Sequence, residues 1–203
     1  MTKGFLNVAD EATAMARLVG ANVDEIKDKS DVRLMLAINK LVIAEVVTQY
    51  TLIDEMLAEI IVRHFFDIEP DVLHFEKAWK REKFKIFVHH ILDEMFLLKK
   101  LSLVQAIRPV PSGVSRIINR IDAVRNGLAH SFFPESRKEN RATGKVLYES
   151  ADIRSLDGLR QFKDDAATAY RYLYDRVYGP ELGRVSCGAA RFKLRHTLCS
   201  RAL

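Results

Sequence analysis

The sequence predicts an all-α protein built as an up-down helical bundle. Residues 32–66 contain no glycine or proline, and two later stretches, 112–130 and 156–178, repeat apolar residues every three or four positions. Proline or glycine interrupts the chain between these stretches. At 1.5 Å per residue, residues 32–66 make a helix of about 52 Å. We expect this long helix to be the spine against which the others pack.

A short helix and a linker precede the spine. Residues 8–18 have helical apolar spacing, and the linker that follows contains Gly20 and Asn22. Asp31 is placed to cap the long helix, and the sequence Asp67-Ile68-Glu69-Pro70 ends it. We therefore divide the chain into an N-terminal helix with its linker (1–30), a helical domain (31–180) and a basic, flexible C-terminal tail (181–203).

The middle of the domain is predicted to hold one more long helix. Residues 71–80 mix aromatic and charged residues, which fits a short helix or a loop. A helix then runs from about Lys80 to Ile107, with an apolar stripe of Phe84, Phe87, Val88, Ile91, Leu92 and Met95. Pro111 and Ser112 are start signals for the helix over 112–130.

A short extended segment, Val146-Leu147-Tyr148 with Ile153, is expected before the last helix. That helix has one clear apolar side, and Gly179-Pro180 ends it. The apolar side consists of Leu159, Phe162, Ala166, Ala169, Leu173 and Val177.

Net charge does not by itself indicate nucleic-acid binding. The chain carries +5, but residues 179–203 hold five basic residues and one acidic residue. The body is left with 27 basic and 26 acidic residues. It is nearly neutral, so only local patches can make the case for an anionic partner.

Several features favour a cytoplasmic protein without membrane association. Both cysteines, Cys187 and Cys199, lie in the tail, which fits a reducing setting. The N-terminus lacks the apolar core of a signal peptide, and the most apolar run, Leu34 to Val47, is interrupted by polar residues and is too short for a bilayer. No histidine pair has the spacing of a zinc site, and we expect neither a metal nor a cofactor.

Basic and aromatic residues alternate at the start of the middle helix. Basic residues beside aromatic rings can hold a phosphate chain and stack a base. The same pattern is that of a helix with an aromatic core stripe and lysines on its solvated face, so both interpretations stay open. The residues are Lys77, Lys80, Arg81, Lys83 and Lys85, interleaved with Trp79, Phe84 and Phe87.

Three functional side chains gather near the end of the helix over 112–130. Asn126 and His130 are one turn apart and share a face, whereas Arg125 points about 100° away from Asn126. Gly127 costs this helix about 1 kcal/mol relative to Ala, which indicates close packing by a neighbouring helix or a ligand. The apolar stripe of the same helix is Val114, Ile117, Ile121, Val124 and Leu128.

This arrangement resembles the signature of the HEPN superfamily, in which Arg, a polar residue (most often Asn), three more residues and His end the last core helix of an α-bundle. The sequence from Arg125 to His130, Arg-Asn-Gly-Leu-Ala-His, matches it. The resemblance in helix order runs from about Asp31 to about Tyr178. It implies a HEPN-like bundle, RNA as substrate and a two-fold homodimer in which two motifs meet. HEPN toxins modified by a nucleotidyltransferase antitoxin have Tyr two residues after the His, where this chain has Phe132, so the branch is not identified.

Arg125 and His130 would suffice for metal-independent RNA cleavage. An imidazole gives or takes a proton at neutral pH. A guanidinium stays charged and offers paired donors to phosphate oxygens. Attack by the 2′-OH would leave 2′,3′-cyclic phosphate and 5′-OH ends. Asn126 would orient His130 or hold the phosphate, and Asp54 would fix Arg125 or tune the imidazole.

Asp54 attracts attention because its neighbours on the helix face are apolar or aromatic, and a carboxylate placed there needs a partner. HEPN proteins often carry an acidic residue in an early core helix that faces the Arg/His helix, and Asp54 resembles it. The alternative is a helix that turns Asp54 toward the edge of the bundle. The face consists of Val47, Tyr50, Asp54, Leu57, Ala58 and Ile61.

The polar segment 135–145 supplies Arg137, Lys138 and Arg141 as candidate RNA-binding residues, although a plain solvated loop explains it equally well. A toxin or phage-defence role, with a cognate antitoxin or regulator as partner, follows only from the family resemblance. The alternative function is a non-catalytic HEPN-like module for RNA binding, protein interaction or dimerisation. In that case Arg125 pairs within the bundle and His130 caps the helix.

Overall fold

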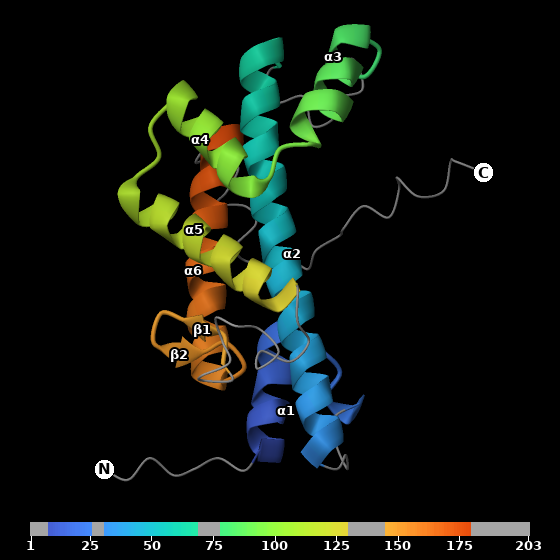
Figure 1. The fold of residues 1–203 in the computed structure, drawn as a ribbon, viewed down its shortest axis with the longest axis vertical. Coiled ribbons are helices and arrows are strands. Elements are labelled where there is room, and N and C mark those ends of the chain that lie inside the picture. Colours follow the sequence, from blue (N-terminus) through green and yellow to red (C-terminus); the bar gives the residue numbers. More distant parts are fainter. Residues whose placement is uncertain (1–7, 26–30, 69–77, 130–144, 180–203) are drawn as a thin grey trace, which may run out of the picture.

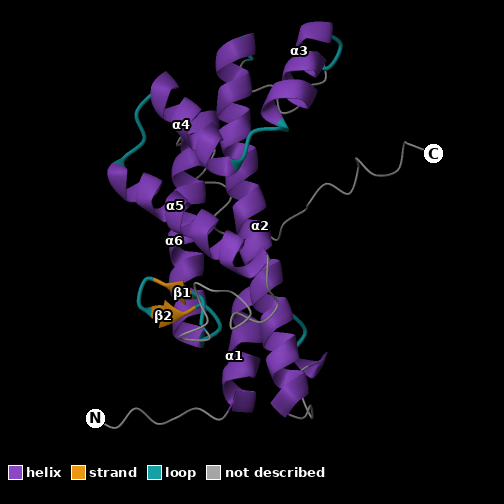
Figure 2. Ribbon diagram, in the orientation of Figure 1, coloured by secondary structure: helices purple, strands orange, loops and turns teal. Residues whose placement is uncertain are grey.

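The computed structural model describes residues 8–25, 31–68, 78–129 and 145–179. These residues form a bundle of α-helices with one small hairpin, so the all-α prediction is confirmed (Figures 1 and 2). Predictions that fall on residues 69–77, 130–144 and 180–203 lie outside the described residues.

Four of the predicted helices form close to their expected bounds. Their ends differ from the expected ones by no more than a residue or two, because the capping and breaking residues are local signals. Ser155 caps the last of them by accepting a hydrogen bond from the Gly158 N–H at 3.1 Å. The helices are α1 (Val8–Val19), α2 (Asp31–Phe66), α5 (Ser112–Ala129) and α6 (Leu156–Tyr178).

The single helix predicted from Lys80 to Ile107 is wrong. The chain forms α3 (Glu82–Phe87), a π-helical segment (Val88–Leu92) and α4 (Leu97–Ile107). Between them, Phe96 has extended backbone angles (φ −70°, ψ 158°), although no glycine or proline marks the break.

Tertiary contacts with α2 explain this break. The α3 helix packs on the C-terminal end of α2, whereas α4 begins beside the middle of α2 and runs back in the same direction as α2 (Figure 1). A straight helix cannot turn back along its partner, so the chain reverses at Phe96. Three pairs define the path: Phe66 with Phe84, Tyr50 with Leu97, and Asp54 with Lys100.

The extended segment predicted before the last helix is a hairpin. Strand β1 (Leu147–Tyr148) pairs antiparallel with β2 (Ala151–Asp152), and Glu149 in the turn has a positive φ of 55°. Tyr148 is buried, and its hydroxyl donates to Asp165 of α6 at 2.8 Å. This bond fixes the hairpin to the last helix.

The elements follow an up-down order from α2 to α6. Glu45 lies at Lys163 (3.1 Å) and Glu59 accepts from the Tyr178 hydroxyl (2.7 Å), so α2 and α6 run in the same direction. The returns are made by α3 and by α5, which crosses α2 obliquely (Figure 1). The α1 helix runs alongside α6 in the same direction, because Glu11 accepts from the Leu156 N–H and Lys163 donates to the Leu18 carbonyl.

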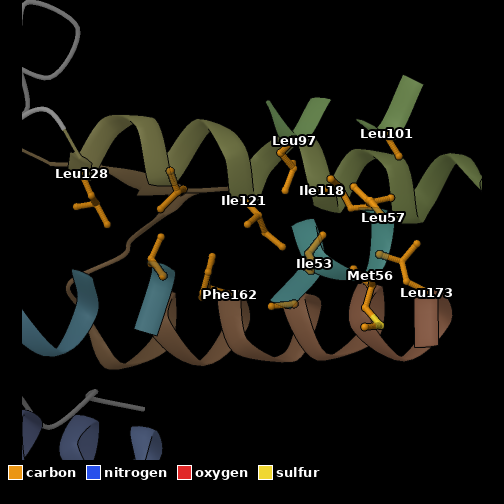
Figure 3. Close-up of a cluster of buried hydrophobic side chains, with 14 of the residues drawn as sticks. Ile53, Met56, Leu57, Leu97, Leu101, Ile118, Ile121, Leu128, Phe162 and Leu173 are labelled. Carbon is orange, nitrogen blue, oxygen red and sulfur yellow. The ribbon is translucent and has the colours of Figure 1, made fainter. Parts of the chain in front are cut away.

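The apolar core lies between α2, α4, α5 and α6 (Figure 3). All six predicted apolar residues of α6 are buried, as Phe162 and Leu173 illustrate. On α5 the prediction is partly wrong, because Ile118 is fully buried and Ile117 only partly. Side chains from all four helices meet in this layer: Ile53, Met56, Leu57, Leu97, Leu101, Ile118, Ile121, Leu128, Phe162 and Leu173.

The spine α2 also has the length and composition of a membrane span. Residues 33–66 reach a mean hydropathy of 1.3 over their most apolar window, of which 22% is buried. The core helix of a soluble protein meets the same criterion, and α2 packs against α1, α4, α5 and α6. Length and composition do not distinguish the two cases, so a cytoplasmic location stays a prediction.

Candidate functional site

The α5 helix holds Arg125 and Asn126 at the edge of the core. Its buried stripe of Ile118, Ile121, Val124 and Leu128 faces the bundle and fixes the rotation of the helix. Arg125 and Asn126 follow directly after buried Val124 and are themselves partly exposed. The apolar packing of α5 therefore presents both polar side chains at a boundary between core and solvent.

The Arg125 guanidinium lies over an aromatic ring. Its Cζ atom is 4.9 Å from the ring centroid of Tyr50 on α2, which is a cation–π distance. Its Nη1 donates to Oδ1 of Asn126 at 3.0 Å. Among the described residues, no carboxylate forms an ion pair with Arg125. A guanidinium has five N–H donors, and the hydrogen bonds between described residues use one of those of Arg125.

Asp122 completes the cluster on α5. Its Oδ2 accepts from Nδ2 of Asn126 at 3.0 Å, which fixes the amide so that its oxygen faces Arg125. Burial raises the pKa of Asp122, while the Arg125 charge and the Asn126 hydrogen bond act to lower it. Asp122 thus fixes the side chain of Asn126, and Asn126 in turn orients the guanidinium of Arg125. The Asp122 carboxylate is hydrogen-bonded to the Asn126 amide, which lies between it and Arg125 in this series of hydrogen bonds.

Tyr50 connects this cluster to the rest of the bundle. Burial raises the pKa of its hydroxyl, and Asp122 and Asp54 raise it further, against an opposing effect of Arg125. The backbone N–H of Leu97, at the start of α4, also faces this hydroxyl. Tyr50 therefore stays neutral at ordinary pH and offers Arg125 an uncharged aromatic face.

Of the two roles predicted for Asp54, fixing Arg125 is not what the structure shows, whereas tuning the imidazole of His130 involves a residue outside the described ones. Its Oδ2 accepts from Nζ of Lys100 at 2.6 Å, and Lys100 is only 6% exposed. Asp54 is thus not hydrogen-bonded to Arg125, and its side chain remains 25% exposed. It is the counter-ion of a lysine that the α2–α4 packing buries. The sequence signal for a buried Lys100 is the helical stripe that it shares with Leu97, Leu101 and Val104.

The close packing predicted at Gly127 is present, but its source is neither a helix nor a ligand. A Cβ atom at Gly127 would lie 3.3 Å from Cγ1 of Val146, the residue before β1. The hairpin is further tied to α5 by Arg120, which pairs with Glu149 in the turn. The end of α5 is therefore supported by the segment that leads into the hairpin.

His130 and the three candidate RNA-binding residues, Arg137, Lys138 and Arg141, lie outside the described residues. The described part of α5 ends at Ala129, directly before His130 in the sequence. The structure thus places two of the four predicted catalytic residues together, Arg125 and Asn126, and assigns Asp54 to a different pair.

Comparisons with known proteins give no family for this chain. No family model, curated protein or solved structure matches it. The function therefore has to be argued from the side chains of the site.

The cluster presents a guanidinium group whose orientation is fixed by neighbouring side chains and which is partly exposed to solvent. The Arg125 guanidinium is oriented by its contacts with the Tyr50 ring and with Asn126. A structural arginine in a bundle is usually matched by a carboxylate, because an unpaired buried charge is costly. An oriented guanidinium with spare donors is suited to bind a phosphate group.

Proposed function

We propose that this protein is a cytoplasmic, metal-independent endoribonuclease of the HEPN type. It cleaves RNA by attack of the 2′-OH on the adjacent phosphorus and leaves 2′,3′-cyclic phosphate and 5′-OH ends. The observation that carries the proposal is the state of Arg125, which is oriented by Tyr50 and Asn126 and forms no ion pair among the described residues; the Asp122 carboxylate interacts with it through charge but is hydrogen-bonded to Asn126. The sequence places His130, a residue able to transfer protons, five positions later.

In this mechanism Arg125 binds the non-bridging oxygens of the scissile phosphate and stabilises the extra charge of the phosphorane. His130 removes the proton of the 2′-OH or protonates the departing 5′-oxygen. Asn126 orients Arg125, a role that its hydrogen bonds to Arg125 and Asp122 support. The mechanism does not require Asp54, whose carboxylate accepts a hydrogen bond from Lys100.

One copy of the motif supplies one arginine, Arg125, and one histidine, His130, whereas the reaction needs both a base and an acid. A two-fold homodimer would bring two copies of the motif to one cleft, and such isologous dimers are the commonest oligomers. We include this dimer in the proposal. A toxin or phage-defence role, regulated by a cognate antitoxin, is its biological extension and would appear as growth arrest on expression, relieved in a His130→Ala variant.

The proposal is tested by incubating purified protein with mixed RNA in EDTA and analysing the new ends. Cleavage with cyclic-phosphate ends, abolished in His130→Ala while the helical circular dichroism is unchanged, supports it. Cleavage that EDTA suppresses, or equal activity in the variant, contradicts the mechanism.

The partial burial of Arg125 also favours a second candidate, a non-catalytic HEPN-like module for RNA binding or protein interaction. Here the contacts of Arg125 with Tyr50 and Asn126 would hold α5 on α2. This module would show no cleavage, and its binding to a partner would survive His130→Ala. Arg125→Ala would then lower stability and leave no separate effect on catalysis.

A further inference from the structure

A second surface of the molecule combines an exposed aromatic ring with exposed basic residues. We call it the Trp79 surface, and it consists of Trp79, Lys80, Arg81, Lys83 and His89. It lies at α3, beside the C-terminal end of α2 and apart from the Arg125 cluster (Figure 1). All five residues are exposed, and Trp79 is 40% exposed.

The Trp79 ring is held in place although much of it faces solvent. Its edge-on contact with buried Phe84 has a centroid distance of 5.1 Å and an interplanar angle of 78°. His89 lies on another side at 5.6 Å. Because Phe84 in turn packs on Phe66 of α2, the ring is anchored to the bundle. A fixed, half-exposed indole can stack a base without first losing conformational freedom.

The cations beside this ring differ in their partners within the described part of the chain. Lys85 pairs with Glu82 at 3.8 Å, and His89 lies 3.4 Å from Asp93. Lys80, Arg81 and Lys83 form no ion pair among the described residues. Three exposed cations that immediately flank an anchored indole are complementary to a chain of phosphates with unpaired bases.

We infer that the Trp79 surface binds single-stranded RNA, with one base stacked on Trp79 and the backbone held by Lys80, Arg81 and Lys83. The inference rests on the proposed function and names its substrate class as RNA with unpaired bases, because paired bases cannot splay out to stack on a side chain.

The spacing between the two surfaces fits such a substrate. Tyr50, under Arg125, and Phe66, beside Phe84 and Trp79, are 16 residues apart on α2, which is about 24 Å along the helix. Single-strand sites in proteins span roughly 4–16 nucleotides, so one strand can reach both.

Exposed aliphatic residues nearby provide the contrast. Ile86 and Ile91 are about half exposed, at 50% and 47%. Isoleucine does not stack bases, so a contribution from these residues would indicate a protein partner in place of RNA. Ile86→Ala is therefore the matched control, because it removes exposed apolar surface from the neighbouring α3 helix without changing the ring or the cations.

The test uses a 2′-O-methyl 12-nucleotide oligouridine, which cannot undergo 2′-OH attack, so binding is measured apart from cleavage. Trp79 is the only tryptophan of the chain, and its fluorescence reports on this surface alone. We expect the oligonucleotide to quench this fluorescence, and we expect a labelled copy to bind with an anisotropy signal. In the anisotropy assay Trp79→Ala should weaken binding about 5- to 150-fold, the range of one stacked base. Trp79→Phe, which retains a ring, should recover most of the loss.

Replacing Lys80, Arg81 and Lys83 together by Gln should reduce the slope of log K against log salt by about 2, at about 0.7 per phosphate contact for single strands. Unchanged fluorescence, unchanged affinity in the Gln variant, or an equal loss in Ile86→Ala would overturn the inference. Tight binding without cleavage of ordinary RNA would refute the proposed function and leave this inference standing. Cleavage of ordinary RNA together with unchanged oligonucleotide binding in Trp79→Ala would refute this inference and leave the proposed function standing.

Discussion

The buried pair of Asp54 and Lys100 makes a prediction about stability. The Lys100 side chain is 7% exposed and that of Asp54 is 25% exposed, with 2.6 Å between Nζ and Oδ2. Removing one partner of a buried pair typically costs about 3–5 kcal/mol, because the other charge stays in the core. Asp54→Ala leaves the more buried ammonium, so we expect a loss of about 4 kcal/mol. Lys100→Ala leaves a carboxylate that water can reach, so we expect about 3 kcal/mol.

These losses would lower the melting temperature by roughly 6–16 °C, at about 2–4 °C per kcal/mol for a chain of this size. The assay is urea unfolding followed by circular dichroism at 222 nm, with midpoints compared at a common slope. The double variant Asp54→Leu/Lys100→Met should unfold within about 1 kcal/mol of the original chain, since apolar replacement of a whole buried pair is often neutral.

Two results would refute this reasoning. If both single variants lose less than about 1 kcal/mol, the pair does not hold α4 on α2. If the stable double variant loses RNA cleavage about 100-fold or more, Asp54 acts in the chemistry after all, and its assignment as the counter-ion of Lys100 is incomplete.

Three further predictions follow from single contacts. Gly158→Ala should lower the unfolding free energy by about 2 kcal/mol, because its Cβ would overlap the carbonyl of Asp152. Gly113→Ala meets open space on α5 and should raise the unfolding free energy by about 0.5–1 kcal/mol. Urea unfolding checks this, since the midpoint should shift down in the first variant and up in the second. Asp122→Asn should raise stability at pH 7, because a raised carboxyl pKa means that folding disfavours the charged carboxylate. The gain in unfolding free energy should shrink as pH falls through the folded-state pKa and vanish below the unfolded-state pKa. A gain that does not depend on pH would be inconsistent with this cause. Tyr50→Phe should keep the cleavage rate within about threefold, and Tyr50→Leu should lower it about 5- to 30-fold through loss of the cation–π contact with Arg125; equal rates in the two variants would argue against that contact.

Local sequence signals predicted the helices whose ends are marked by capping or helix-breaking residues. Ser155, Gly179 and the six-residue apolar stripe define α6 without help from the rest of the chain. Asp31 at the start and the sequence Asp67-Ile68-Glu69-Pro70 after the end delimit α2 in the same way. The break at Phe96 could not be predicted, because no residue there disfavours a helix. It is decided by contacts of Leu97 and Lys100 with residues about 46 positions earlier.

In the site, too, some features follow from the local sequence and others only from the packing of distant residues. The grouping of Arg125 with Asn126 follows from adjacency on α5, so the sequence predicts it directly. The aromatic support from Tyr50 depends on how α5 crosses α2, which periodicity does not reveal. Asp54 and Lys100 were each detectable as charges on apolar stripes, but only their packing shows that they satisfy one another. Gly127 in the helix sequence indicated a close neighbour, and the structure shows that this neighbour is Val146.

The central claim is that the Arg125 guanidinium is held for a phosphate. It is tested most directly by comparing initial rates of RNA cleavage in EDTA for Arg125→Ala and Arg116→Ala, which remove an arginine from the same helix. Arg116 is exposed and lies two and a half turns earlier, so its loss controls for net charge. We predict a fall of about 10²–10³ for Arg125→Ala and less than about threefold for Arg116→Ala, with both variants folded. Equal rates in the two variants would contradict the account.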